Sequence, residues 1–348
     1  MNWHARMLNA DELKPYQKSQ SEYGFRDDVV ALIEHQKENW SALGEGYAAL
    51  SQIETRRIES DGSSVVVQHN PRRVRSTAAA VDRASIEARK CFLCADHLPA
   101  EEKGIAYDEN LVILCNPFPV LDNHLVITHK NHVEQKIDGH IEDLLALAFD
   151  LGEAFFVLYN GAECGASAPD HFHLQACSRK LLPIDEVLKN TEPSADIDCD
   201  VCEDLARRDF ELFTLGDFGR SAIVFRAASR IEITNWAYQV IQALAAATGK
   251  PEPMMNLIAY FERGIFTLIL FPRARHRPAC FYGEGEARMM ISPGAVDMAG
   301  ILVMPEQAHY EKIDAGQIEA IFKEVSLPIE QVEEILEPLC AIQTPVGF

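Results

Sequence analysis

The sequence predicts an α+β fold. Strand-like and helix-like segments are interspersed through all 348 residues, and several strand-like segments follow one another directly, as in β-hairpins. Such pairs favour antiparallel sheets flanked by helices over the strand–helix–strand units of a parallel sheet. With 47% hydrophobic residues, the chain can build one large core or two of ordinary size.

The first half, residues 1–190, combines a helical N-terminal extension with a mixed region. The apolar spacing predicts helices over 28–50 and, with the broadest apolar stripe, over 140–158. The strand-like segments are 63–77, which runs into a basic loop, 110–134, which holds two strands joined by a proline-bearing turn, and 168–176. We therefore expect a sheet packed against at least one long amphipathic helix.

The second half, residues 216–348, repeats this mixture after an acidic linker at 191–215, which is poor in apolar residues up to Val201. A helix is predicted over 233–247, and the C-terminal segment is also helical in pattern. Strands are predicted over 221–226, 255–261, 265–271 and 299–305, with a basic loop at 272–278. The pattern predicts a second α+β half.

Charge and composition exclude several classes of function. A net charge of −21 argues against a general nucleic-acid binder, although a few arginines can still hold a small anionic substrate. No apolar run is long enough to span a membrane, and the N-terminus lacks the apolar stretch of a signal peptide. Nine cysteines, an odd number, indicate reduced thiols or metal ligands. We expect a cytoplasmic protein.

The stretch "APDHFHLQA", residues 168–176, places His171, His173 and Gln175 at alternate positions. In a strand these side chains share one face, while Phe172 and Leu174 pack behind them. A neutral histidine whose other ring nitrogen is held by an acceptor can attack phosphorus, and His173 is our candidate. Gln175 would be a neutral hydrogen-bond donor beside the attacked group. Two purely structural histidines on an exposed strand are the alternative.

The loop before this strand, "NGAECGASAPD", is rich in small residues. Gly161, Gly165 and Ser167 permit tight turns and leave backbone N–H groups free, which suits a phosphate site.

A possible metal site begins at Cys91-Phe-Leu-Cys94. Two cysteines at this spacing can bind one zinc ion, which needs two further S or N ligands, and His132 and His171 are candidate donors. A redox pair or coincidence is the alternative. Cys199-Asp-Val-Cys202 has the same spacing and could instead complete a site of four thiolates.

Two basic loops could neutralise phosphates in this acidic chain. They contain Arg72, Arg73 and Arg75, and Arg273, Arg275 and Arg277. Solvated surface charge with local carboxylate partners is an equally simple interpretation.

Together these motifs resemble the histidine-triad superfamily, on its nucleotidyltransferase branch. Hydrolases of that superfamily carry a third histidine where this chain has Gln175, whereas galactose-1-phosphate uridylyltransferases, diadenosine tetraphosphate phosphorylases and GDP-hexose phosphorylases carry glutamine. "YNGAECGASAPDHFHLQA" and "CNPFPVLDNHLVITHKNH" are similar to phosphorylase motifs. In the second half, "MNLIAYFERGIFTLILFPRARHR" and "MMISPGAVDMAGILVMP" resemble the C-terminal half of the phosphorylases. The likeness covers roughly 65–175 and 220–312, and implies two histidine-triad-like halves in one chain.

The resemblance also implies roles for individual residues. His173 would form a nucleotidyl-histidine, and Gln175 would hold a non-bridging phosphate oxygen. Asn160 would orient the loop or the phosphate, and Ser167 would contact the phosphate. The uridylyltransferase pattern for a structural zinc maps onto Cys91, Cys94, His132 and His171.

The implied activity is ping-pong nucleotidyl transfer. The substrate would be a nucleoside diphosphate sugar or a dinucleoside polyphosphate, and the acceptor would be phosphate or a sugar phosphate. A histidine-triad nucleotide hydrolase and a non-catalytic nucleotide-binding protein are the alternatives. The sequence does not specify the base, the sugar or the oligomeric state.

Overall fold

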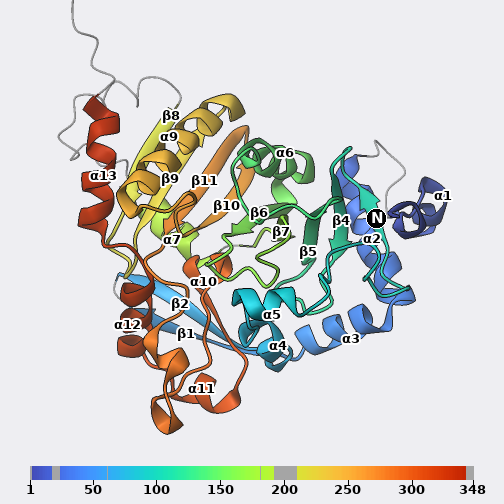
Figure 1. Ribbon diagram of the computed structural model, residues 1–348, viewed down its shortest axis with the longest axis horizontal. Helices are drawn as coiled ribbons and strands as arrows, with labels where there is room; N and C mark the ends of the chain where they lie inside the picture. The colour runs from blue at the N-terminus through green and yellow to red at the C-terminus, as the bar shows by residue number, and fades with distance from the viewer. Residues whose placement is uncertain (1, 18–23, 61, 181, 192–209, 342–348) are drawn as a thin grey trace, which may run out of the picture.

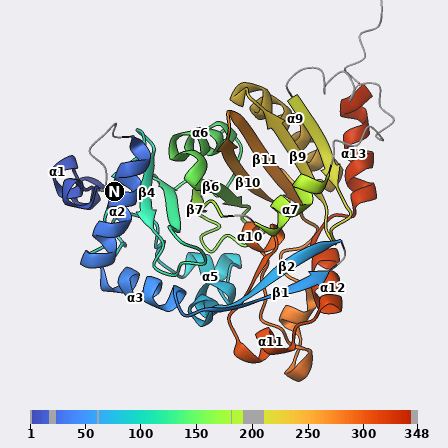
Figure 2. The same cartoon turned by 180° about the vertical axis from the view of Figure 1, so that it is seen from behind.

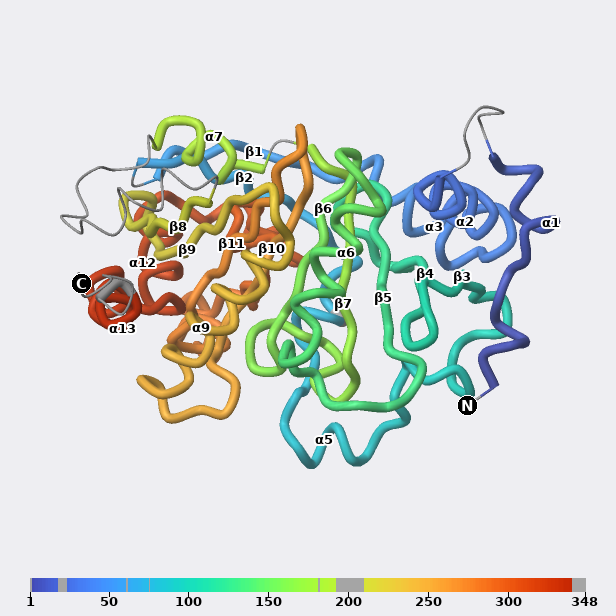
Figure 3. The backbone as a smooth tube through the Cα atoms, turned by 90° about the horizontal axis from the view of Figure 1, so that it is seen from above, coloured from blue at the N-terminus to red at the C-terminus, as the bar shows by residue number. Residues whose placement is uncertain are grey.

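The computed structural model describes residues 2–17, 24–60, 62–180, 182–191 and 210–341. Its largest element is a nine-stranded sheet in the order β3-β4-β5-β7-β6-β10-β11-β9-β8, and every neighbouring pair is antiparallel. The strands are β3 (Gly104–Ala106), β4 (Leu111–Cys115), β5 (Leu125–His129), β6 (Phe155–Asn160), β7 (His173–Ser178), β8 (Phe210–Leu215), β9 (Ala222–Ala227), β10 (Met255–Glu262) and β11 (Ile265–Pro272). Figure 3 shows this order across the molecule.

A second, three-stranded sheet packs against the large sheet on the face opposite helix α6 (Ile141–Leu151). It consists of β1 (Glu54–Ser60), β2 (Ser63–His69) and β12 (Ile301–Met304), with β12 parallel to β2. Its strands β1 and β2 are labelled in Figures 1 and 2. This second sheet therefore joins the N-terminal and C-terminal parts of the chain, which sequence patterns alone did not indicate.

Helices cover both faces of the large sheet. The helices are α1 (Ala10–Leu13), α2 (Phe25–Asn39), α3 (Ser41–Leu50), α4 (Val74–Thr77), α5 (Arg83–Glu87), α6 (Ile141–Leu151), α7 (Pro183–Asn190), α9 (Arg230–Thr248), α10 (Ala295–Met298), α11 (Gln307–Lys312), α12 (Ala315–Val325) and α13 (Ile329–Ala341). The predicted α+β class with antiparallel sheets flanked by helices is thus confirmed.

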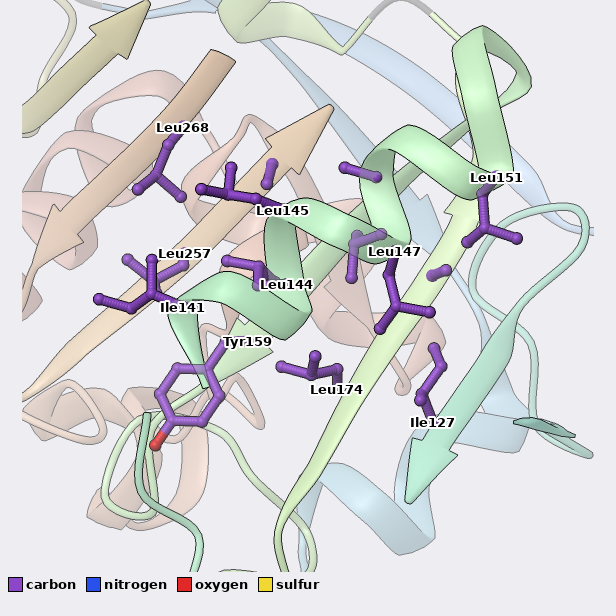
Figure 4. Close-up of a cluster of buried hydrophobic side chains, with 14 of the residues drawn as sticks. Ile127, Ile141, Leu144, Leu145, Leu147, Leu151, Tyr159, Leu174, Leu257 and Leu268 are labelled. Carbon is purple, nitrogen blue, oxygen red and sulfur yellow. The ribbon is translucent and has the colours of Figure 1, made fainter. Parts of the chain in front are cut away.

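The main core lies between α6 and the sheet (Figure 4). Leu144, Leu145 and Leu147 are fully buried on α6, and they belong to the same core cluster as Leu174 and Leu257 from the strands. Burying a leucine side chain contributes about 1.5–3 kcal/mol, so this interface supplies much of the stability of the central strands.

Three predicted elements differ clearly from the structure in extent. The helix predicted over 140–158 ends at Leu151, because Gly152 adopts a positive φ of 65° and the next residues enter β6. The helix predicted over 28–50 is two helices, since Trp40 between them is extended. The strand predicted over 168–176 begins only at His173.

The last six residues of the expected linker also differ from the prediction, because they form β8 with buried Phe210, Phe213 and Leu215. Strands from the two halves meet at the pairing of β6 with β10, where Leu158 lies opposite Ile258. The halves therefore share one sheet. Within the described ranges, none of the helices has the length and hydropathy needed to cross a membrane.

Candidate active site and metal centre

A cavity of about 770 Å³ lies on the face of the large sheet opposite α6. Its floor comes from β5, β6 and β7, one wall from residues 73–89, and another from residues 292–297 of the second half. The predicted site residues that line it are Arg73, Asn160, Gly165, Ser167, His173 and Gln175.

His173 is held as a neutral imidazole with one free nitrogen. Its Nδ1 lies 2.9 Å from the carbonyl oxygen of His171, so Nδ1 carries the proton and donates it to this bond. The lone pair then resides on Nε2. Burial lowers the pKa of His173, against opposing effects of the His171 carbonyl and Asp170. The ring is only 4% exposed, but it lines the cavity, so a ligand inside can reach it.

The orientation of Gln175 follows from a chain of hydrogen bonds. The backbone N–H of Val120 can only donate, and it lies 3.1 Å from Nδ1 of His124. The pKa of His124 is lowered to about 3, chiefly by burial, so the ring is neutral and its proton is on Nε2. Nε2 lies 2.8 Å from Oε1 of Gln175 and 3.3 Å from the amide nitrogen of Asn116, so its proton is directed to the closer glutamine oxygen. The glutamine oxygen is therefore occupied, and its NH2 group remains as the donor for a ligand.

Asn160, at the end of β6, is oriented in the same way. The guanidinium group of Arg273 donates to Oδ1 of Asn256 at 2.5 Å, so the other end of the Asn256 amide must be NH2. That NH2 donates to Oδ1 of Asn160 at 2.8 Å, and Ala295 N–H donates to the same oxygen. The Asn160 NH2 group is left to face the cavity, so two amides present donors near His173.

Gln135, which the sequence interpretation missed, fixes the start of β7. Its side-chain oxygen accepts the N–H of His173 at 2.7 Å, and its NH2 group donates to the carbonyl oxygens of His173 and Asn160. Gln135 is 1% exposed, so it ties β6 to β7 from inside the protein. No motif marks it. His124 does lie in a quoted motif, but without an assigned role.

The small-residue loop packs against the second half of the chain. Gly165 has a φ of 96°, and a Cβ atom there would lie 3.1 Å from the Cα of Gly294, so both space and conformation require glycine. Gly161 does not line the cavity. Its N–H donates to the carbonyl of Met255 on β10, which anchors the loop.

The predicted arginines separate into different environments. Arg73 lines the cavity, donates to the carbonyl of Phe118 and faces Asp297, whose pKa burial raises to about 6. Arg72 does not line the cavity, and pairs with exposed Glu45 at 3.0 Å. Among the other candidates, Arg275 pairs with a surface carboxylate and Arg277 holds the 77–79 backbone, while the side chain of Arg75 lies outside the described structure.

The prediction that Arg273 binds substrate needs correction. Its side chain is 2% exposed, and each of its five N–H donors already has a protein acceptor. The acceptors are Val325 O, Asn256 Oδ1, Pro293 O, Arg275 O and His276 O. Arg273 does not line the cavity, and it acts on the site only by orienting Asn256.

Arg89 is a cation that the sequence interpretation did not select. It lines the cavity, pairs with Asp170 at 2.9 Å, and lies 3.4 Å from the carbonyl oxygen of Ser167. Its Nη1 atom is buried and has no partner among the described residues. Because Arg89 lines the cavity near Ser167, its positive charge favours an anionic ligand there.

The four residues predicted to bind a metal lie together. One donor atom from each of Cys91, Cys94, His132 and His171 falls within 4.8 Å of every other. Nδ1 of His171 is 3.3 Å from the Cys91 sulfur, and Nδ1 of His132 is 3.4 Å from the Cys94 sulfur.

The donor set suits a metal ion. Nε2 of His171 donates to the His129 carbonyl at 2.7 Å, so its Nδ1 lone pair faces the sulfurs. Two thiolates and two imidazoles form a tetrahedral set. The cluster could therefore hold a metal. The rival cysteines, Cys199 and Cys202, lie outside the described residues.

The fold is similar to that of known nucleotide enzymes. Yeast Ap4A phosphorylase in complex with AMP matches with a TM-score of 0.57 and 15% identity, covering 85% of this chain and 96% of that one. The complex of the yeast enzyme with Ap4A matches with a TM-score of 0.53 and 13% identity, covering 84% and 97%. The fold implied by the resemblance to the nucleotidyltransferase branch of the histidine-triad superfamily is thus confirmed.

A family model described as "Domain of unknown function (DUF4922)" matches residues 32–178. This range contains His173, Gln175, Asn160 and the Cys2His2 cluster. No curated protein matches the chain.

Proposed function

We propose that the protein is a nucleotidyltransferase that acts through a nucleotidyl-histidine intermediate on His173. The observation that carries this proposal is the state of the imidazole, which is neutral, has its proton fixed on Nδ1, and has its Nε2 lone pair free beside a cavity. The fold of an enzyme crystallised with AMP and with Ap4A supports a nucleotide as the ligand.

In the first step, Nε2 of His173 attacks the α-phosphorus of a nucleoside diphosphate sugar or a dinucleoside polyphosphate. An N–P bond forms, the bridging P–O bond breaks, and a sugar phosphate or nucleotide departs with the bonding electrons. In the second step, phosphate or another sugar phosphate attacks the same phosphorus and restores the imidazole. The covalent intermediate divides the transfer into two displacements, each with a lower barrier than direct attack of one anionic phosphate on another.

The neighbouring groups stabilise charge on the phosphoryl oxygens. The NH2 groups of Gln175 and Asn160 are already oriented, so little reorganisation is needed when charge shifts onto the non-bridging oxygens. Ser167 and Arg89, which also line the cavity, add a hydroxyl donor and a positive charge. The side-chain amide of glutamine does not titrate near neutral pH, so Gln175 cannot act as a base towards water. We therefore expect transfer to phosphate or sugar phosphate rather than hydrolysis.

We further propose that the Cys2His2 cluster holds one structural zinc ion. Cys91, Cys94, His132 and His171 would be its ligands, and the ion would fix the turn that leads into β7. His173 would stay in place because His171, two residues earlier, is anchored. The zinc ion takes no part in the displacement.

Product analysis tests the proposed reaction. Purified protein is incubated with GDP-, ADP- and UDP-sugars and with dinucleoside polyphosphates, each with and without phosphate. We expect nucleoside diphosphate to form only when phosphate is supplied as the acceptor, and a new nucleotide sugar to form when a sugar phosphate is supplied instead. Release of nucleoside monophosphate at the same rate without phosphate would identify a hydrolase and contradict the proposal. Binding without turnover for every substrate pair would identify a binding protein.

A further inference from the structure

One carboxyl group lines the cavity away from the phosphate-facing amides. Glu102 is 8% exposed and belongs to the cavity wall. No residue in the described part of the chain forms a hydrogen bond or an ion pair with its carboxyl group, and only Arg6 lies close enough to oppose the effect of burial. A buried carboxyl group without a partner is unfavourable, so a ligand that supplies N–H donors would satisfy it.

Glu102 and Gln175 line the same cavity, and the sheet register gives the separation of their strands. Gly104 pairs with Leu114, Leu114 with Val126, and Val126 with Gln175, which forms one row across four strands. Three strand spacings correspond to roughly 14 Å, and Glu102 comes two residues before this row begins. Leu114 is covered by a separate apolar cluster, so a nucleotide whose phosphate contacts Gln175 would reach Glu102 through the cavity and not along this row.

The surroundings of Glu102 suit a flat base. Trp40 lines the same cavity. Gln36 connects the segment of Glu102 to that of Trp40, because its side chain accepts the N–H of Lys103 at 2.8 Å and its backbone carbonyl accepts the N–H of Trp40 at 2.9 Å. Aromatic and apolar side chains provide the stacking surface on which nucleobases are held.

We infer that Glu102 selects a guanine base, so that the substrate is a guanine nucleotide. Both oxygens of a carboxylate accept hydrogen bonds, and guanine presents two adjacent donors, N1–H and the N2 amino group. Adenine presents one donor and one acceptor, which a glutamine would match better than a glutamate. Uracil presents a single donor between two acceptors. The inference rests on the proposed function in one respect, since both place a nucleotide in this cavity.

In the ligand-free protein, the direction of the pKa shift of Glu102 agrees with a buried carboxyl group that lacks a partner. Burial raises the pKa of Glu102 to about 8, and Arg6 lowers it only in part. Two N–H donors from a base would favour the ionised form and offset this desolvation.

Calorimetric titration of the full chain with GMP, AMP and UMP tests the inference. We expect GMP to bind at least about ten-fold more tightly than AMP or UMP, because a bidentate pair discriminates by about 1–3 kcal/mol. Glu102→Gln should weaken GMP binding by about 10- to 100-fold and bring it close to AMP binding. Glu101→Gln is the matched control, because the side chain of Glu101 is exposed. This variant should bind GMP like the wild type.

Equal GMP affinity in Glu102→Gln and wild type, or a wild type that prefers AMP or UMP, would overturn the inference. The melting temperature of nucleotide-free Glu102→Gln shows whether the variant is folded. The two proposals fail separately. An adduct on His173 formed only from adenine or uracil nucleotides would retain the proposed function and reject guanine selection. Glu102-dependent GMP binding without any transfer would retain guanine selection and reject the proposed function.

Discussion

At the scale of single residues, groups that can only donate hydrogen bonds determine which amide donors face the cavity. The Val120 N–H fixes the tautomer of His124, and His124 then fixes the amide of Gln175. The Arg273 guanidinium orients Asn256, and Asn256 in turn orients Asn160. Neither cavity amide can flip without leaving a donor facing a donor. The site is therefore preorganised before a ligand binds.

Replacing His124 tests this preorganisation. In His124→Ala the Gln175 oxygen loses its donor and the amide can rotate, so we expect kcat to fall by about 10- to 100-fold. KM should change less, because the cavity keeps its other contacts. His124→Gln can again accept from Val120 and donate to Gln175, and should recover part of the lost rate. Steady-state kinetics of both variants distinguish this from a merely structural role, which would lower their melting temperatures and rates together.

Glu102 gives a prediction about pH. Burial raises the pKa of the Glu102 carboxyl group to about 8 in the folded protein, whereas in an unfolded chain the group has its ordinary pKa of 4.5. Rising pH therefore favours unfolding between these values, and the loss levels off above pH 8. Nucleotide-free Glu102→Gln lacks this penalty. Its melting temperature should exceed that of the wild type at pH 8 and match it near pH 4.5, as thermal unfolding across this range would show.

At the scale of elements, the site depends on the seam where β6 of the first half pairs with β10 of the second. Asn160 ends β6, Asn256 is its partner on β10, and Arg273 follows β11. The sequence indicated these strands from their apolar residues and placed Arg273 in a basic loop as a candidate to bind phosphate. Sequence spacing could not reveal its environment, because four of its acceptors are carbonyls of distant or irregular backbone and the fifth is the side chain of Asn256.

Arg273→Met should destabilise the protein by at least about 3 kcal/mol, because five buried acceptors lose their donors at once. Arg275→Ala is the matched control. Its side chain is 61% exposed and forms a surface ion pair with Glu324, so the expected change is under about 1 kcal/mol. Urea unfolding monitored by circular dichroism measures both. Similar midpoints for the two variants would contradict the anchoring role of Arg273.

The proposed zinc site gives a second prediction at this scale. Protein purified without chelators should contain about one zinc ion per chain, and Cys91→Ser should lose it and melt at a lower temperature. Cys280→Ser, in a half-buried cysteine outside the cluster, should keep its zinc. Elemental analysis of the wild type and both variants measures the zinc content per chain. Loss of zinc in Cys199→Ser with retention in Cys91→Ser would favour the rival ligands.

At the scale of the whole molecule, the sequence predicted the fold class, most strands and the grouping of the metal-ligand candidates. The strands follow from local periodicity and the cysteine pair from its spacing, which a single sequence records, whereas the full set of four ligands came from the resemblance to the uridylyltransferases. It did not predict the three-stranded sheet, since β12 pairs with β2 across more than 200 residues of chain. It also missed Gln135, Arg89 and Glu102, which acquire their roles only from tertiary neighbours.

The most direct test of the central claim is the intact mass of the protein after brief mixing with a nucleotide sugar or a dinucleoside polyphosphate in the absence of acceptor. We predict a mass increase of one nucleotidyl group that is reversed by adding phosphate and absent in His173→Ala. A protein that turns over such a substrate without this increase, or that still gains it in folded His173→Ala, would contradict the account.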